Sequence, residues 1–312
     1  MAAKKITSRK TPEPAAHHHN MCCLVNANAG TAGASPGEVV AAAFKTHGVL
    51  PHIIEVQEGD DIHALTRQAL AQGHKVMVSG GGDGTVNAVA SCVIGQKGIT
   101  FGVLPMGTYN HFAKDLVIPL DLAAAAGVIV AGHTRAIDVG SVNGHIFVNN
   151  SSVGIYPAMV RLRVALQKSG YRKSIAAAWA ALRILARFPR LRIALHSADA
   201  SLPATATPMI FVGNNRYAMD LAQWGTRPSL QDGKLWVMVS SAAGRLAMLR
   251  SLLSVLWSQQ DVANVIFFET DRFRVTTRHR YAKVAVDGEV LRLTTPLDYE
   301  IRPHALQVIV AK

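Results

Sequence analysis

The sequence has few of the residues that build a secreted scaffold or cross a membrane. Its three cysteines are too few for a disulfide framework, which favours a reducing compartment. No apolar run approaches the roughly twenty residues that a membrane-spanning helix needs, and the most apolar candidate, 121–132, is an alanine-rich stretch that predicts a packed helix. Cys22 and Cys23 stand in an apolar run and are interpreted as buried strand residues rather than metal ligands.

Acidic residues are also scarce, and one region has none. The net charge is +12, and between Asp138 and Asp199 there are nine basic residues and no acidic one. A basic surface suits nucleic acid or an anionic membrane. Because no nucleic-acid-binding motif is present, we expect no nucleic-acid partner and a cytoplasmic protein that associates peripherally with an anionic membrane surface.

Two stretches in the second half have helical patterning. Residues 174–188 place Ile175, Trp179 and Leu182 on one face and basic residues on another. Two interpretations stay open, an interfacial helix near a lipid surface or an ordinary helix with a solvated basic side. A second apolar helix, 245–259, is expected to pack on a sheet.

The order of periodic segments predicts two domains after a tail. Residues 1–20 lack apolar periodicity and are expected to form a disordered basic tail, whose histidines at 17–19 suggest only adventitious metal binding or an expression feature. Residues 21–134 alternate strands and helices, which predicts an α/β domain with a mainly parallel sheet. Residues 135–312 consist mostly of short alternating runs, which predict a β-rich, sandwich-like domain. The chain can return to the first domain at its C-terminus.

A glycine-rich loop follows the apolar run at 76–78 in the segment VMVSGGGDGTVN. Gly81, Gly82 and Gly84 let the main chain approach a ligand, and its amide groups, with the helix expected to start near Thr85, favour a phosphate. Asp83 would repel a bare phosphate, and Mg²⁺ resolves the conflict because it binds carboxylate and phosphate oxygens together. The loop therefore indicates a magnesium nucleotide, with a tight structural turn as the alternative.

Two further polar loops follow predicted strands. Thr108 and Asn110 come after the run at 99–104 and can either reach a nucleotide or cap a helix. Asn26, Asn28 and Gly30 follow the first strand, where a structural turn and a nucleotide loop are equally compatible with the residues.

Two carboxylates stand at the end of another predicted strand. Asp287 and Glu289 flank a glycine in VAVDGEV. Asp-Gly is typical of a hairpin turn, but a carboxylate here can also take a proton from a hydroxyl that attacks a phosphate.

These motifs together resemble the diacylglycerol kinase catalytic domain, the lipid kinase family that includes sphingosine kinases and bacterial soluble lipid kinases. The resemblance runs in order from about residue 20 to 312. The matching segments are GGDGTVN (81–87), LPMGTYNHFAKDL (104–116), VNNSSVGIYPAMV (148–160), VGNNRYAM (212–219), DGKL (232–235) and VDGEV (286–290).

The resemblance implies a kinase that transfers a phosphoryl group from ATP, with Mg²⁺, to diacylglycerol or a related lipid. The implied nucleotide-binding residues are Asn26, Asn28, Gly30, Gly81, Gly82, Asp83, Gly84, Thr85, Asn87, Thr108 and Asn110. The implied base is Asp287, with Glu289 as a second candidate, and the lipid is expected to enter between the domains.

The resemblance also implies a structural Mg²⁺ held by Ser229, Asp232 and Lys234, largely through backbone oxygens, with a plain hairpin turn as the alternative. Asp138 is expected either to be buried with a partner or to face the crevice, where the family places an aspartate near the metal and phosphates. Asp115 is interpreted as a solvated helix residue.

Two departures from the family's pattern and two rival functions remain. Ala27 and Thr31 stand where the family has a proline and a lysine. An NAD kinase shares the GGDGT loop, and a nucleotide-regulated lipid-binding protein without catalysis would retain the same motifs. The oligomeric state is left open, a homodimer included.

Overall fold

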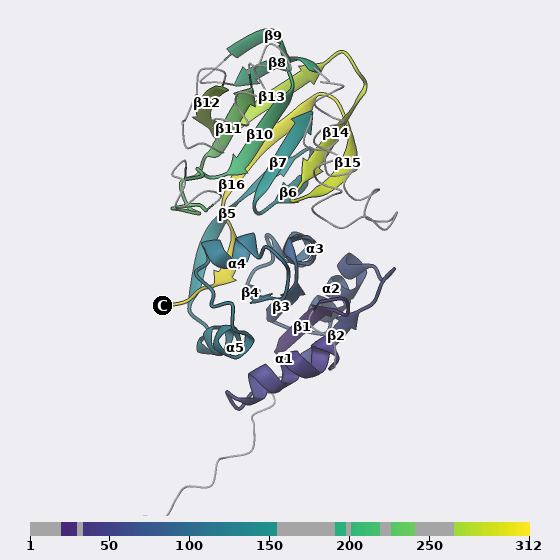
Figure 1. The fold of residues 1–312 in the computed structure, drawn as a ribbon, viewed down its shortest axis with the longest axis vertical. Helices are drawn as coiled ribbons and strands as arrows, with labels where there is room; N and C mark the ends of the chain where they lie inside the picture. The colour runs from purple at the N-terminus through teal and green to yellow at the C-terminus, as the bar shows by residue number, and fades with distance from the viewer. Residues whose placement is uncertain (1–19, 30–33, 155–190, 198–200, 219–225, 241–264) are drawn as a thin grey trace, which may run out of the picture.

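The structure, a computed structural model, describes residues 20–29, 34–154, 191–197, 201–218, 226–240 and 265–312. Figure 1 shows two lobes, one of mixed helices and strands and one of strands. The expected helices at 174–188 and 245–259 lie outside the described residues, as do Gly30 and, except for Arg192, the basic stretch.

The first lobe is built on four parallel strands in the order β2-β1-β3-β4. The strands are β1 (Met21–Asn26), β2 (His52–Val56), β3 (Val76–Gly81) and β4 (Thr100–Pro105). The helices are α1 (Pro36–Lys45), α2 (Ile62–Ala71), α3 (Asp83–Val93), α4 (His111–Asp115) and α5 (Leu122–Ala131). The predicted alternation of strands and helices in this lobe is confirmed.

Side-chain caps set where three of these helices begin. Ser35 accepts from the Glu38 amide, and Glu38 in turn accepts from the Ser35 amide, a reciprocal capping box at the start of α1. Asp61 and Asp121 cap α2 and α5 in the simpler one-sided way.

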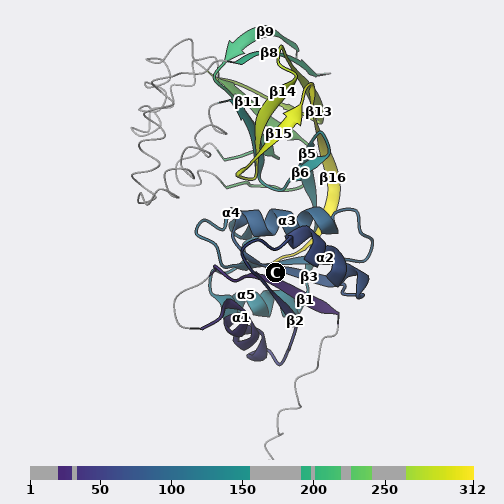
Figure 2. The same ribbon diagram turned by 90° about the vertical axis from the view of Figure 1, so that its right-hand side faces the viewer.

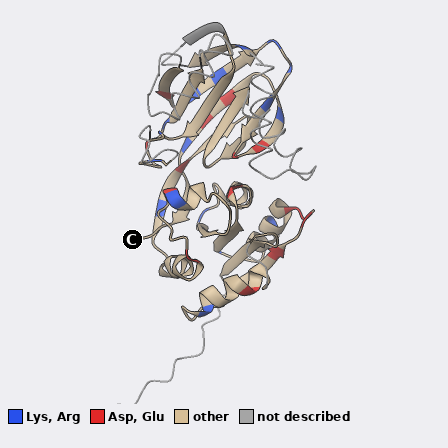
Figure 3. Cartoon of the chain, in the orientation of Figure 1, with Lys and Arg blue, Asp and Glu red and all other residues tan. Residues whose placement is uncertain are grey.

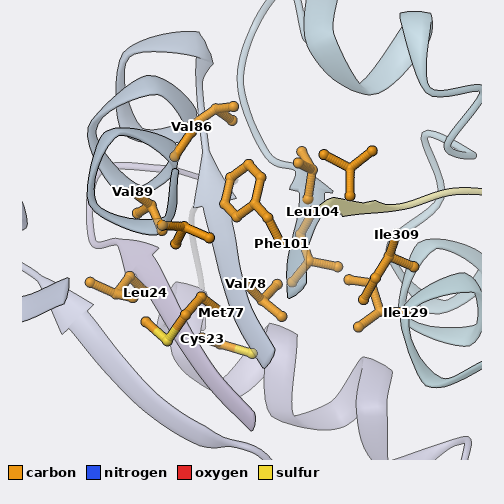
Figure 4. Packing of buried hydrophobic residues seen from close by; sticks show 14 of the residues in the cluster. Cys23, Leu24, Met77, Val78, Val86, Val89, Phe101, Leu104, Ile129 and Ile309 are labelled. Atoms are coloured by element: carbon orange, nitrogen blue, oxygen red, sulfur yellow. The ribbon is translucent and has the colours of Figure 1, made fainter. Parts of the chain in front are cut away.

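The helices cover the two faces of the parallel sheet. Figure 2 shows α1 and α5 on one face and α2, α3 and α4 on the other, toward the second lobe. Figure 4 shows the core between these layers, with Leu24 and Met77 toward Val86 and Val89 of α3. Because strand side chains alternate, Cys23 lies on the opposite face from Leu24. Both cysteines of β1 are fully buried, as predicted.

Two long strands connect the lobes. β5 (Thr134–Val142) and β16 (Leu297–Ile309) pair in antiparallel fashion along nearly their whole length. The end of β16 lies beside β4, at the pair Val308 and Phe101, while its beginning pairs with β13. The register shifts between Arg302 and Leu306, where His304 has a positive φ of 52°. The chain thus returns to the first lobe at its C-terminus.

The second lobe is formed by strands of two sheets. A six-stranded sheet has the order β12-β11-β10-β7-β14-β15, and β13, β8, β9 and β6 extend the sheet that contains β5 and β16. These strands are β6 (His145–Phe147), β7 (Asn150–Gly154), β8 (Leu191–Ser197), β9 (Ser201–Thr207), β10 (Met209–Asn214), β11 (Leu235–Ser240), β12 (Val265–Thr270), β13 (Arg272–Thr277), β14 (Tyr281–Val286) and β15 (Glu289–Thr294). A second hydrophobic core, which includes Phe147, Phe273 and Tyr299, lies between the sheets. The predicted sandwich-like architecture is confirmed.

The described surface carries both signs of charge, as Figure 3 shows. Acidic residues lie on α1 and in the loop before α2 of the first lobe, and basic residues lie on β13, β14 and β15 of the second. None of the described helices has the length and apolar character needed to cross a bilayer.

Candidate active site

An open cleft of about 520 Å³ lies between the two lobes. Its first-lobe lining comes from the start of α2 and from α3, and its second-lobe lining comes from the β14–β15 turn. The lining residues are Asp60, Asp61, Ile62, His63, Gly84, Ala88, Asp287, Gly288 and Glu289. Gly84 of the predicted glycine loop and both predicted catalytic carboxylates therefore line the same cleft.

The glycine loop joins β3 to α3 and is shaped by close contacts that exclude side chains. A Cβ on Gly81 would lie 2.6 Å from the Thr85 hydroxyl oxygen, so this position accepts only glycine. Gly82 is the N-cap of α3 and supplies no side-chain cap, which leaves amide groups of the first turn without an intrahelical acceptor. Asp83 begins the helix, and its carboxylate makes a long contact of 3.4 Å with the Phe112 amide of α4.

The second loop packs directly against the first. A Cβ on Gly107 would lie 2.5 Å from the Gly82 Cα, so the backbones of the two loops touch. Asn110 holds the second loop closed, because its Oδ1 accepts from the Gly107 amide at 2.8 Å and its Nδ2 donates to the Gly107 carbonyl at 2.9 Å. It is also the N-cap residue of α4, with a positive φ of 51°. Thr108 is exposed at the tip.

The other predicted nucleotide residues lie around these loops. Asn26 forms a local turn, accepting from the Asn28 amide at 2.8 Å, and its Nδ2 lies 3.5 Å from the Thr85 hydroxyl. Asn87 follows on α3 with a buried side-chain oxygen that has no hydrogen-bond partner. The loops after β1, β3 and β4 thus gather at one edge of the sheet, as expected for parallel strands.

Asp287 forms a two-residue hairpin turn with Gly288, and both have positive φ, 45° and 89°. Its carboxylate accepts three backbone hydrogen bonds, from Val148, Asn149 and Asn150 at 2.8 to 2.9 Å. Burial raises the pKa of Asp287 to about 6, against the lowering effect of those amides. The sequence left open whether this Asp-Gly pair only forms a hairpin turn or also presents a carboxylate. In the structure Asp287 forms the turn, and backbone amides fix the position of its carboxylate. Glu289 is exposed and begins β15.

A buried arginine that the sequence analysis missed ties the lobes together. Arg227 pairs with Asp115 at the end of α4, with Nη2 2.6 Å from Oδ2 and both side chains almost fully buried. It also donates to the carbonyls of Val148 and Asn214 at 2.5 and 3.1 Å and to Asn149 Oδ1 at 3.1 Å. The same segment, 148–150, carries the amides that hold Asp287.

The interpretation of Asp115 as a solvated helix residue is therefore wrong. Its position in the sequence, one turn into a short helix, could not predict an ion pair with an arginine that follows more than a hundred residues later. Two carboxylate oxygens accept from the Arg227 amide and guanidinium, which satisfies a charge that burial would otherwise make very costly.

Asp138 is buried with partners, which was one of the two expectations for it. Its carboxylate accepts from the Gly233 amide at 2.7 Å and from the His304 amide at 2.9 Å. It thereby anchors the turn before β11 to the bulge in β16. The Gly233 contact also places Asp138 beside the loop predicted to hold a structural Mg²⁺.

The loop that carries Ser229, Asp232 and Lys234 has a few oxygen atoms that could bind a cation. Asp232 is exposed, the Ser229 hydroxyl accepts from the Gln231 amide at 3.2 Å, and the Lys234 carbonyl accepts from the Asn215 amide at 3.1 Å. Hard oxygen donors of this kind fit Mg²⁺, and the same geometry also makes an ordinary turn.

A nucleotide in this cleft would need a cation beside it, because the cleft is lined by negative charges. Four of its lining residues are carboxylates, Asp60, Asp61, Asp287 and Glu289, and Asp83 lies in the adjoining loop. These groups would repel a triphosphate, whereas Mg²⁺ binds carboxylate and phosphate oxygens together. The donor set therefore fits Mg²⁺.

Comparison with known proteins places the chain in a family. Residues 20–142 match the model of the diacylglycerol kinase catalytic domain, and residues 152–310, about half of the chain, match that of the YegS C-terminal NAD kinase beta sandwich-like domain.

Similar proteins agree with these two matches. A probable lipid kinase YegS-like protein of Klebsiella pneumoniae is 26% identical over 275 residues, which cover 85% of this chain and 87% of that protein. A diacylglycerol kinase of Staphylococcus carnosus is 34% identical over 99 residues, 31% of this chain and 32% of that protein. The crystal structure of a diacylglycerol kinase from Bacillus anthracis shares the fold, with a TM-score of 0.66 at 19% identity over 94% of this chain and 97% of that one.

The parallel sheet with its paired glycine loops, the β-rich second lobe and the two family matches lead to one assignment: the chain belongs to the lipid kinase family that combines a diacylglycerol kinase catalytic domain with a YegS-type C-terminal domain.

Proposed function

We propose that this protein transfers the γ-phosphoryl group of ATP to a hydroxyl of diacylglycerol or a related lipid, in the presence of Mg²⁺. In this proposal residues 21–134 form the nucleotide-binding domain and residues 135–312 the lipid-substrate domain. The observation that carries it is the shared cleft, where the amino-terminal turn of α3 faces Asp287 and Glu289 from the other lobe.

The first lobe supplies the nucleotide site. The amide groups of Gly82 to Thr85 point from a helix N-terminus, where both the free N–H groups and the helix dipole favour phosphate. Asn26, Asn28 and Asn87 lie around this loop, as do Thr108 and Asn110, and Gly30 belongs to the same group by resemblance. Bound Mg²⁺ would neutralise the phosphate charge, with Asp83 as the nearest loop carboxylate.

The second lobe supplies the base. As the lipid hydroxyl attacks the γ-phosphorus, the new O–P bond forms, ADP leaves with the bond electrons, and Asp287 accepts the hydroxyl proton. A pKa of about 6 suits this task, because the carboxylate is mostly ionised near neutral pH and still basic enough to take a proton. Glu289 is the second candidate.

The lipid enters through the open cleft, whose lining includes the apolar Ile62 and Ala88. The lipid would come from an anionic membrane that the protein contacts peripherally, as expected for a cytoplasmic protein with a basic stretch at 161–192. Ser229, Asp232 and Lys234 are proposed to hold a second, structural Mg²⁺ away from the chemistry.

The direct experiment offers several acceptors to the protein with labelled ATP and Mg²⁺. Diacylglycerols in mixed micelles, sphingoid bases and NAD are incubated separately, and the labelled product is separated and counted. We expect label in the lipid. Transfer to NAD alone would support an NAD kinase, and nucleotide binding without transfer to any acceptor would support a lipid-binding protein that lacks catalysis.

Substitutions at the two carboxylates separate their roles. Asp287→Asn should lower kcat by about 10²–10⁴-fold, the usual effect of losing a general base, with nucleotide affinity nearly unchanged. Glu289→Gln, two residues away on the same hairpin, is the matched control and should retain most of the activity. The reverse pattern would transfer the role to Glu289, and full activity of both variants would exclude this hairpin as the source of the base.

A further inference from the structure

Three side chains with nitrogen or sulfur donors meet at the amino-terminal edge of the parallel sheet, opposite the edge that carries the glycine loops. Cys22 on β1 pairs in register with His52 on β2. Because paired residues of neighbouring strands point to the same face, their side chains lie together. His74 comes from the turn between α2 and β3, where its amide donates to the Ala69 carbonyl.

The turn that carries His74 is fixed to β1 by its neighbours. The amides of Lys75 and Val76 both donate to the Asn20 carbonyl, at 2.8 and 2.9 Å. His74 is 8% exposed and Cys22 is fully buried, whereas His52 is exposed. Two of the donors are therefore anchored in the fold, and the third faces solvent.

The spacing of the donor atoms matches that of a tetrahedral metal site. His52 Nδ1 lies 3.2 Å from His74 Nε2. With zinc–nitrogen bonds of about 2.0–2.1 Å, two imidazole ligands of a tetrahedral Zn²⁺ lie about 3.3 Å apart. One donor atom each from Cys22, His52 and His74 all lie within 4.8 Å of one another, and no other group of three or more histidine, cysteine, aspartate or glutamate side chains in the described part of the chain meets this criterion.

We propose that Cys22, His52 and His74 form a binding site for Zn²⁺. One thiolate and two imidazoles are donors that zinc prefers over the hard cations, and the exposed side of His52 leaves an entry path and room for a water as fourth ligand. The ion would replace the proton shared between the two rings.

The site would act on stability rather than on phosphoryl transfer. It joins the starts of β1, β2 and β3, whereas Asn26 of the nucleotide site stands four residues further along β1, about 13 Å away at 3.3 Å per residue. Zinc would therefore hold the three chain segments together at the edge of the sheet opposite the proposed nucleotide site.

The test must first remove the adjacent histidines, because His17, His18 and His19 can bind metal by themselves. We would replace these three by alanine in the full chain and titrate Zn²⁺ against a chromogenic chelator. We expect one equivalent of Zn²⁺ to bind. His52→Ala replaces an exposed side chain, so the variant should fold, and it should weaken zinc affinity by at least about 100-fold, since even outer-shell changes cost 10–100-fold. His133→Ala, at another exposed histidine, is the matched control and should bind as the parent does.

Cobalt provides a second measurement that reports the sulfur ligand. In the same background, Co²⁺ should give a thiolate-to-cobalt charge-transfer band that Cys22→Ser abolishes and Cys23→Ser retains. Cys23 is the next residue of β1 and is equally buried, so the two substitutions should cost the same in packing. Because Cys23 points to the other face of the sheet, it cannot bind the metal.

Saturating Zn²⁺ should also raise Tm by about 5 °C or more in the parent and leave that of His52→Ala unchanged. Stoichiometric zinc binding that His52→Ala does not weaken, a cobalt band that survives Cys22→Ser, or no binding at all would overturn the proposal and show that the histidines form only a hydrogen-bonded pair beside a buried thiol.

Discussion

The two lobes contribute to the cleft in different ways. The first lobe offers backbone, in loops where Gly81 and Gly107 allow contacts that a side chain would not permit. The second lobe offers a side chain, Asp287, held by amides from a segment far away in sequence. Backbone sites are local and appear as glycine motifs, whereas a held carboxylate depends on a network that only the folded chain brings together.

The largest effect is expected where the two contributions are joined, at the buried pair of Arg227 and Asp115. Asp115→Ala leaves the guanidinium buried without its carboxylate, and should lower the free energy of unfolding by about 3–5 kcal/mol. Urea denaturation measures this. Asp298→Ala, at the exposed pair with Arg274, is the control and should change stability by less than about 1 kcal/mol. Equal losses at the two sites would mean that the buried pair does not hold the lobes together.

Gly107→Ala tests the backbone contribution of the first lobe. The added Cβ forces apart the two loops, and overpacking of this kind costs about 1–3 kcal/mol, which we expect to weaken Mg-ATP binding by roughly 10- to 100-fold. Gly102→Ala is the matched control, because a Cβ there would press on the side chains of Ile129 and Val78 at 3.3 Å in the core of the lobe, away from the two loops. Calorimetric titration of a non-hydrolysable ATP analogue distinguishes them. If both variants bind as tightly as the parent, the contact between the loops has no part in the nucleotide site.

The pH dependence tests the contribution of the second lobe. Burial raises the pKa of Asp287 to about 6, and the base must be ionised to accept a proton. We therefore expect kcat/KM to be level above that pH and to fall about tenfold per unit below it. In Asp287→Asn this limb should disappear from the residual activity. A limb that persists unchanged in that variant would belong to another group.

Asn26→Ala should have the smallest effect. Its side chain reaches the Thr85 hydroxyl only at 3.5 Å and otherwise forms a local turn, so its loss should change stability by at most about 1 kcal/mol and raise the Kd for the ATP analogue only a few-fold. Thermal unfolding and the same titration check both values. A loss as large as that of Gly107→Ala would show that this loop contacts the nucleotide more closely than the structure suggests.

The same difference explains which parts could be predicted from sequence. The parallel sheet, its helices and the glycine loops follow from apolar periodicity and from positions that need a capping residue or glycine, such as Ser35 and Gly81. The strand-rich second lobe follows from alternation in the runs after residue 135. None of these depends on a distant partner.

Two of the three features that were missed depend on distant partners. Asp115 directly follows Lys114 but pairs with Arg227, which stands 112 residues later in a segment without a motif, so their ion pair had no local signal. Asn110 was expected to reach the nucleotide or to cap a helix, and the structure adds a third role, because both of its amide atoms close the loop that contains it. Cys22, His52 and His74 are separated by whole helices and strands; strand register brings the first two together, and the turn before β3 adds the third.

A crystal structure of the protein soaked with Mg²⁺ and a non-hydrolysable ATP analogue is the most direct test of the central claim. The account predicts that the triphosphate lies against the amides of Gly82 to Thr85, with its terminal phosphate facing the hairpin of Asp287. A nucleotide bound elsewhere, with the glycine loop unoccupied, would contradict it.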